Sequence, residues 1–466
     1  MKRTLSLSAI ISIIFFGVCG GPYAVEGVLA AGPGLALLLM VLTPLLWSTP
    51  IALVCAELGS ALPNEGGYYA WSTRTLGQGG AFCHGMWAWL FTVVDIGIYP
   101  AMFCDYLAYF IPAVGGEGSF VLRKTIMLAI VWTFVVLNLL GTKVIANFTR
   151  AFVLLVLTPF VLLVGISVWR AMFGDVPRNP ASPFLAPGLS LPAALGATIP
   201  LAMWNFQGWD SSSTLAGEME HPRRDYPRGL FFTVILVVLT YSLPAIAVLL
   251  HVPFVAEEWD VGAWSMLAAR VGGSELGMLV SAAGMVSALG LFSMLLFTYS
   301  RVPFAMSCDG YFPRAFGRTN RAGVPAVSLL FSGVAYSAVI LCISDFDTLA
   351  EASVTFYAGT ILLEMLSFLV LRYREPHLPR PFRVPGGWFV ACLVSALPLT
   401  LAAIGATCRS LEQGVWNVVG LAVVLMLCSA ATYPLARLFR REVVLIDHGY
   451  EPEARAPGAS LIDQKT

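Results

Sequence analysis

Apolar runs long enough to cross a membrane follow one another along almost the whole of this 466-residue chain. Each run has about 20 residues, and a helix of that length spans a hydrocarbon core of about 30 Å. Only 12% of the residues are charged, about half the share that soluble domains carry. The pattern excludes a soluble enzyme, a disordered protein and a nucleic-acid-binding protein, and the unbroken runs exclude a β-barrel, whose spans alternate. The sequence predicts an all-α membrane protein embedded in the lipid bilayer.

Twelve spans are predicted, and they form one transmembrane domain over residues 1–437, followed by a polar tail over residues 438–466. The spans cover about residues 5–31, 34–58, 79–112, 122–141, 145–171, 191–218, 229–251, 274–305, 325–344, 350–371, 388–408 and 414–436. The first ten form two successive groups of five, over about residues 5–171 and 191–371, and the last two, over about 388–436, are accessory.

The distribution of basic residues predicts the orientation. Of the 27 lysine and arginine residues, 21 fall on the side that carries both termini, and cytoplasmic loops are the ones enriched in these residues. We therefore expect an integral plasma (inner) membrane protein with both termini in the cytoplasm. Lys2 and Arg3 before the apolar run 5–18 imitate a signal peptide. Val18 is not the small residue that a lipoprotein cleavage site needs, so we interpret the run as a retained first span.

The first span is interrupted by Gly17, Gly20, Gly21 and Pro22. Proline removes a backbone donor and clashes with the preceding turn, and glycines lower the free energy needed to unwind a helix. The alternative is that the glycines merely allow close helix packing, as Gly17 and Gly21 four residues apart would.

The sixth span is interrupted at a corresponding place, where polar residues stand at mid-membrane depth: Asn205, Gln207, Gly208 and Asp210. Irregular backbone at that depth is tolerated only where it is buried or lines a cavity. Broken helices at matching positions of two halves are typical of inverted-repeat transporters, which bind substrate at the breaks. We predict such a site here.

Five acidic residues lie within the predicted spans, and no lysine or arginine lies near the middle of a span. They are Glu26, Asp95, Asp105, Asp210 and Glu364. An unpaired charge is costly in hydrocarbon, and intramembrane acids are functional candidates by default. Each must therefore be protonated or meet an incoming cation, which suits a proton-coupled carrier, a carrier of cations, or both.

Asp95 and Tyr99 are four residues apart, and Met102 and Tyr106 continue the same predicted helical face. An acid and two phenols along one stripe would suit an amine-bearing substrate, and the alternative is a packed core face. Asp105 points about 80° away from Asp95 on the helical wheel, so we expect it to be structural.

The other acids each have a structural alternative. Glu26 begins the resumed first span, where a helix dipole stabilises a carboxylate, and we favour a ligand or proton-carrying role. Asp210 could cap the second half of the sixth span, contact substrate, or both. Glu364 could carry coupling protons or pair with Arg372, about two turns away.

Aromatic residues flank the break in the sixth span, where rings could cover a ligand. Our substrate-binding candidates are Gly20, Gly21, Glu26, Asp95, Tyr99, Trp204, Asn205, Trp209 and Asp210. We expect no cofactor or metal, because the nine cysteines show no CxxC spacing and the five histidines are scattered. No Walker motif supports ATP-driven transport.

Four segments resemble the amino acid–polyamine–organocation superfamily: GGPYAVEGVLAAGP (20–33), AELGSALPNEGGYYAW (56–71), STLAGEMEHPRRDYPRGL (213–230) and SRVPFAMSCDGYFP (300–313). The sequence is most similar to plant-type polyamine uptake transporters, which carry GGP-x-G-x-E at the first break and WDS followed by STLAGE in the sixth span. The similarity extends over about residues 5–440. This sequence departs from the family pattern at Ala24, where the family usually has glycine. It also departs in the fifth span, which lacks the buried lysine of some proton-coupled relatives.

The resemblance implies a LeuT-like bundle of ten core and two accessory helices, and it places Glu218, with Glu26 and Glu364, among coupling or gating residues. We expect secondary active uptake of a polyamine, another organic cation or an amino acid. Protons are the expected coupling ion, because the eighth span has no adjacent Ser/Thr pair of the kind that sodium carriers of this fold use.

Two alternatives stay open. One is an amino-acid permease or exchanger in which the Gly20 and Gly21 amides hold a substrate carboxylate. The other is a non-transporting sensor built on a transporter fold, which the short tail disfavours.

Overall fold

Helices and their connections make up all the regular structure that the computed structural model describes, apart from one isolated β-bridge between Leu5 and Met219. The described residues are 5–63, 67–116, 118–140, 149–174, 177–213, 219–320, 323–343, 346–414 and 417–439. The predicted all-α class is confirmed for these residues. The predicted tail over 438–466 lies almost wholly outside them, as does Glu218.

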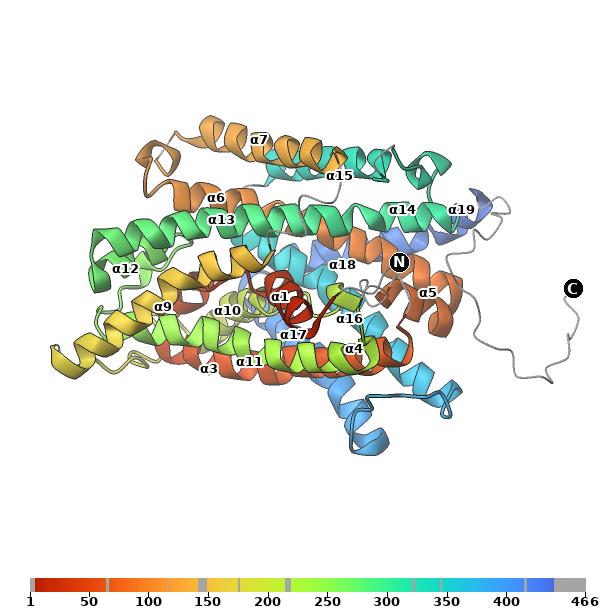
Figure 1. The fold of residues 1–466 in the computed structure, drawn as a ribbon, viewed down its shortest axis with the longest axis horizontal. Helices are drawn as coiled ribbons and strands as arrows, with labels where there is room; N and C mark the ends of the chain where they lie inside the picture. Colours follow the sequence, from red (N-terminus) through yellow and green to blue (C-terminus); the bar gives the residue numbers. More distant parts are fainter. Residues whose placement is uncertain are drawn as a thin grey trace, which may run out of the picture.

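The described residues of the first half of the chain form the following helices and one 3-10 turn (Figure 1). They are α1 (Leu7–Val18), α2 (Glu26–Ala30), α3 (Pro33–Thr43), the π-helix η1 (Pro44–Ser48), α4 (Thr49–Ala61), α5 (Gly67–Asp95), α6 (Ile98–Leu107), the 3-10 turn η2 (Pro112–Val114), α7 (Phe120–Leu139), α9 (Thr149–Phe173) and α10 (Leu191–Asn205).

The second half is built in the same way from longer helices. They are α11 (Pro222–Leu249), the 3-10 turn η4 (Ala256–Glu258), α12 (Ala263–Gly272), α13 (Ser274–Tyr299), α14 (Arg301–Cys308), the 3-10 turn η5 (Arg314–Gly317), α15 (Ala326–Cys342), α16 (Phe346–Arg374), α17 (Gly387–Gln413), α18 (Val418–Ala431) and α19 (Tyr433–Phe439).

Nine helices of the described residues are apolar and long enough to cross a membrane. Three predicted spans are shorter helices: α1, α10 and α15. The first two stop where the sequence predicts a break, at Val18 and Asn205. The count of twelve spans and the inverted repeat stay predictions.

The third span begins earlier than predicted, at Gly67 rather than at residue 79. The polar segment that we assigned to a loop is helical, and Gly77, with φ of +72°, kinks the helix inside it. The same span also ends differently, because two turn residues separate α5 from α6. Arg74 at this polar end is partly exposed and pairs with Glu375 at 2.6 Å. The charge of Arg74 therefore stays at the rim of the bundle. For this reason the segment can be helical although it is polar.

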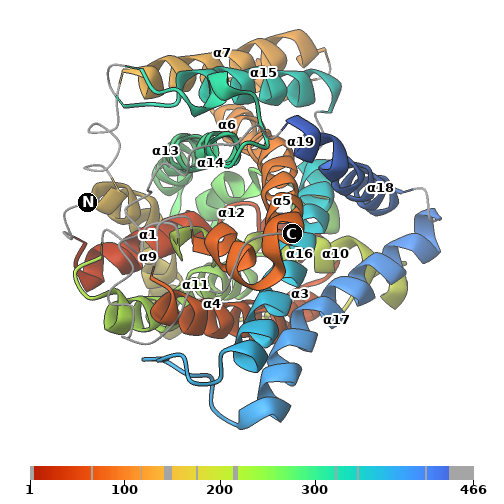
Figure 2. The same ribbon diagram turned by 90° about the vertical axis from the view of Figure 1, so that its right-hand side faces the viewer.

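The broken helices lie inside the bundle, and unbroken helices surround them. α16 packs on α5, α10 packs on α17, and α11 packs on α4 and α1. Figures 1 and 2 both show α7 and α15 side by side at one edge of the molecule, away from α10. Outward-facing apolar side chains on α7 and α9, such as Val136 (53% exposed) and Val161 (68% exposed), suit a lipid-facing surface.

A buried ion-pair cluster closes the end of the bundle where α16 stops. Glu57 of α4 accepts hydrogen bonds from Arg372 Nε at 2.9 Å and from the Val384 backbone N–H at 2.7 Å, and it lies 3.1 Å from Arg380 Nε. Arg372 therefore pairs with Glu57 and not with Glu364, so the structural alternative considered for Glu364 is wrong. The sequence could not show this, because Glu57 lies 315 residues away.

Candidate functional site

The first break is a stretch of seven residues between α1 and α2 whose carbonyl groups are satisfied from other helices. Trp264 Nε1 donates to the Pro22 carbonyl at 2.7 Å, and Tyr23 donates to the Val280 carbonyl at 3.0 Å. Ser287 donates to the carbonyl of Gly20. Trp264 and Ser287 each satisfy a carbonyl group of the break, and Tyr23 anchors the break to α13, which lets irregular backbone persist inside the bundle.

Ala24 in this break has a φ of +67° and is the one described residue other than glycine with a positive φ. Left-handed backbone is costly for residues with a Cβ. The departure from the family pattern noted above therefore falls where glycine would fit best.

The second break follows α10 at Asn205 and touches the first. Gly208 has a φ of +94°, and a Cβ placed on it would lie 2.7 Å from the Gly17 carbonyl oxygen. Only glycine allows this approach of two backbones. The hydroxyl of Tyr357 on α16 accepts from the Gly208 N–H at 3.0 Å, which fixes the second break against α16.

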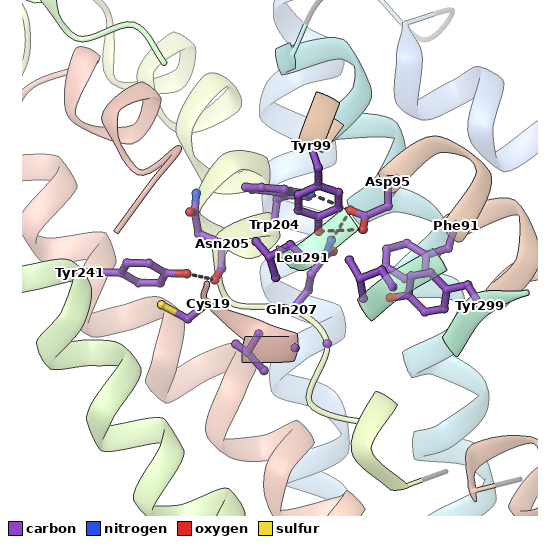
Figure 3. Close-up of a pocket in the computed structure, with 14 residues that line it drawn as sticks. Cys19, Phe91, Asp95, Tyr99, Trp204, Asn205, Gln207, Tyr241, Leu291 and Tyr299 are labelled. Atoms are coloured by element: carbon purple, nitrogen blue, oxygen red, sulfur yellow. Dashed lines mark hydrogen bonds between the residues drawn. The ribbon is translucent and has the colours of Figure 1, made fainter. Parts of the chain in front are cut away.

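A small pocket lies where the two breaks meet (Figure 3). Backbone of Gly17–Cys19 and of Asn205–Gly208 lines it, together with side chains of four further helices. Its aromatic walls are Phe91, Tyr99, Trp204, Tyr241 and Tyr299. Such a mixture of apolar walls and a few converging polar groups is typical of small-molecule sites.

Asp95, at the end of α5, is the acidic group of this pocket and is 1% exposed. Its Oδ1 accepts from Trp204 Nε1 at 2.8 Å, from Gln207 Nε2 at 3.1 Å and from Ser353 Oγ at 2.9 Å. Its Oδ2 accepts from Tyr99 at 3.0 Å. Four neutral donors orient the carboxylate and supply no positive charge, so the group remains able to pair with a cation.

Two more acceptors line the same pocket. The amide nitrogen of Asn205 donates to the carbonyls of Leu201 and Ala24, at 2.9 and 3.3 Å, and that of Gln207 donates to Asp95 and Ser353. The amide oxygens of Asn205 and Gln207 are buried and have no hydrogen-bond partner. A buried acceptor without a donor is unfavourable, so these oxygens and Asp95 favour a ligand that donates hydrogen bonds.

A second small pocket adjoins the first and shares Phe91 and Tyr299 with it. Asp210 lies in this second pocket, 6% exposed, and accepts from Tyr357 at 2.6 Å. The two rings at the shared wall pack edge to face at 5.6 Å. One acidic group therefore stands on each side of a wall of two aromatic rings.

The structure brings together four of the predicted site residues in the first pocket: Asp95, Tyr99, Trp204 and Asn205. Trp209 is fully buried beside it and donates to the Phe206 carbonyl at 2.7 Å. Gly20 and Gly21 belong to the first break but do not line either pocket.

Glu26 lies apart from both pockets, at the start of α2 as predicted. Its Oε1 accepts from Tyr106 at 2.5 Å and from the Gly262 N–H at 3.2 Å. Tyr106 therefore faces Glu26, and the single stripe predicted from Asp95 to Tyr106 divides into two. Asp105 pairs with Arg123 at 2.6 Å outside the pockets, in the structural role expected of it.

Sequence reasoning missed Ser353, Tyr299, Phe91 and Tyr357 as site residues. Nothing local distinguishes them from the other serines and aromatics of apolar helices. The position of Gln207 in the second break indicated a site residue, but we did not predict it as a ligand.

Comparison with known proteins gives consistent results. Residues 5–428 match the family model described as amino acid permease. The chain is 32% identical to a "probable polyamine transporter" of Arabidopsis thaliana, over 93% of this chain and 84% of the relative. It is also 32% identical to the polyamine transporter PUT1 of Oryza sativa subsp. japonica, over 92% of this chain and 79% of the relative. The polyamine transporter RMV1 of Arabidopsis thaliana is 29% identical, over 91% and 84%.

Proposed function

The chain belongs to the amino acid permease family, and from this premise we propose that it takes up polyamines or related organic cations by proton symport. The family makes the chain a secondary transporter of amine-bearing substrates and not an enzyme. We further propose that the substrate is cationic and that protons drive its uptake. We also propose that the protein lies in the plasma membrane with both termini in the cytoplasm.

The observation that carries the proposal is the surplus of acceptors in the first pocket. Asp95, Asn205 and Gln207 all line the pocket, the amide oxygens of the last two have no partner, and no lysine or arginine lines the pocket among the described residues. Ammonium groups donate hydrogen bonds and bring positive charge, so they complement this lining. The aromatic rings around it add cation–π attraction.

The second pocket favours a substrate with more than one ammonium group. Asp210 stands beyond the Phe91–Tyr299 wall, so an extended di- or triamine would find one acid in each pocket. A zwitterionic amino acid brings as much negative charge as positive and leaves one of these acids unpaired. The names of three relatives, all polyamine transporters, agree with this choice.

The family description itself favours a second candidate, an amino-acid permease. In that case Gly20 and Gly21 would meet the substrate carboxylate, although neither residue lines the pockets.

Uptake into proteoliposomes distinguishes the two candidates. Labelled putrescine, spermidine, arginine and leucine are each supplied with and without an inward proton gradient. We expect saturable spermidine and putrescine uptake that the gradient increases. Saturable leucine uptake that excess spermidine leaves unaffected would contradict the proposal.

A further inference from the structure

A second group of buried titratable side chains lies beyond the substrate pocket, between α4, α5, α16 and the second break. His84 of α5, Glu364 of α16 and Cys55 of α4 are fully buried, and Asp210 of the second break is 6% exposed. Only Asp210 lines a pocket. Buried ionisable groups at membrane depth are functional candidates, and substrate binding leaves His84 without a role.

The two acids of this group, Glu364 and Asp210, are both buried. A buried carboxyl group in a low-dielectric interior resists ionisation unless a cation pairs with it. Cys55 points its thiol at Glu364 Oε2 at 3.7 Å, and Tyr357 donates to Asp210. Among the described residues, no arginine or lysine lies within 4.0 Å of either acid to act as that cation.

The imidazole of His84 is held with one nitrogen directed at Glu364. Nδ1 lies 2.6 Å from Ser72 Oγ, which in turn lies 3.3 Å from Ser367 Oγ, and the ring of Tyr68 packs against the imidazole at 4.9 Å. Nε2 lies 3.8 Å from Glu364 Oε1. Both of these atoms are buried and have no hydrogen-bond partner.

Two unsatisfied atoms that face each other are explained if one is a donor and the other an acceptor. When the Nδ1–H donates to Ser72, Nε2 carries a lone pair. A proton on Glu364 Oε1 then needs an approach of only about 1 Å to form a hydrogen bond with Nε2.

We propose that His84 accepts the coupling proton from Glu364 during the transport cycle. The O–H bond at Oε1 breaks, and its electron pair stays on the carboxylate. The new N–H bond at Nε2 uses the imidazole lone pair, which leaves an imidazolium facing a carboxylate. This inference rests on the proposed function, because it assigns the group that receives the proton in a proton symporter.

Substrate binding supplies a reason for the transfer. An ammonium group beside Asp210 stabilises the ionised form of the buried acids near it, so the proton on Glu364 becomes easier to lose. His84 is the base next to Glu364.

Other charged groups near this end of the bundle are already paired. Asp309, just after α14, is bonded to Tyr69, and Glu375 is bonded to Arg74. Glu57 of α4 holds Arg372 and Arg380. The acids facing His84 itself are therefore Glu364 and, through it, Asp210.

The test uses the purified full-length chain in proteoliposomes loaded with a pH-sensitive dye. Wild type is expected to accumulate labelled spermidine under an inward proton gradient and to acidify the lumen when spermidine is added. For His84→Gln we expect loss of both signals, with spermidine counterflow retained, because exchange of bound substrate needs no net proton movement.

A matched control is His251→Gln. His251 is a partly buried histidine that bonds Ser167 on another face of the bundle, and the variant is expected to keep both signals. Gradient-driven accumulation and lumen acidification at wild-type levels in His84→Gln would overturn the inference. If wild type itself transports spermidine without moving protons, symport fails and the inference fails with it. A wild type that transports no spermidine refutes the proposed function before any variant is compared.

If His84→Gln does not elute as a monodisperse protein, Ser72→Ala takes its place. This variant keeps the imidazole and removes the partner of Nδ1. We expect reduced accumulation under a gradient with counterflow retained, and unchanged accumulation would overturn the inference equally.

Discussion

At the scale of single residues, Asp95 has a different environment from the one its sequence position indicates. The helical wheel placed it on a stripe with Tyr99 and Tyr106. The structure keeps Tyr99 beside it but adds donors from three distant elements, through Trp204, Gln207 and Ser353. Periodicity identifies neighbours along one helix, and it carries no information on partners from other helices.

We predict that Asp95→Asn weakens spermidine binding and uptake by roughly 10- to 100-fold, because a hydrogen bond to a charged group is worth about 1.5–3 kcal/mol. Folding should stay near normal, since the amide still accepts from Tyr99 or Ser353. The measurement is the concentration dependence of uptake, together with elution in detergent.

The control for this variant is Asp105→Asn, ten residues further along the same span. Asp105 pairs with Arg123 at partly exposed positions, where an ion pair contributes little. Uptake by the control should stay within about twofold of wild type. Equal losses in the two variants would show that any missing charge in this span impairs transport, and the Asp95 site would be refuted.

For Glu364, the sequence could predict some properties of the residue but not its partner. Its burial could be inferred from an isolated acid in an apolar span, and its coupling role stays a prediction. Its partner could not be inferred, because Arg372 on the same helix turns to Glu57 and leaves Glu364 to His84. Competition between distant residues for one arginine is decided by the packing of α4, α5 and α16.

At the scale of elements, the breaks in the first and sixth spans were the most predictable part of the fold. Gly20, Gly21 and Pro22 carry the local chemistry that ends a helix, and α1 ends just before them. The kinked start of α5 was missed, because its polar residues 67–78 resemble a loop in composition. Their helix depends on contacts with α16 and α14, which composition does not reveal.

The contact between the two breaks leads to a prediction about Gly208. Gly208→Ala should abolish transport and lower the melting temperature, because the new Cβ would lie 2.7 Å from the Gly17 carbonyl oxygen at a φ of +94°. Such strain is worth on the order of 1–3 kcal/mol. Thermal unfolding in detergent and spermidine uptake measure the two effects.

Gly165→Ala on α9 is the comparison for that variant. A Cβ at Gly165 would meet nothing within 4 Å, and alanine favours helix over glycine. We expect normal uptake and an unchanged or slightly higher melting temperature. If Gly208→Ala behaves like this comparison, the two breaks are not in the close contact described.

At the scale of the whole molecule, the energy source is the main question. We predict that a protonophore collapses spermidine accumulation and that replacing sodium by choline leaves it unchanged. The physical reason is the lack of an adjacent Ser/Thr pair on α13, together with the burial of two acids, Asp210 and Glu364. Accumulation in proteoliposomes under defined gradients is the measurement, and strict sodium dependence would contradict the prediction.

The wall of Phe91 and Tyr299 between the two pockets has a consequence for how substrates of different length behave. A molecule whose ammonium groups are joined by a flexible tether engages the second acid intramolecularly once the first is bound, so the local concentration of its free end is high. A chain too short to pass the wall gains no such avidity. Among homologous diamines, affinity should therefore rise abruptly at the length that bridges the wall. Dwell time inside the carrier should lengthen at the same point, so the best-bound diamine is not the one carried fastest.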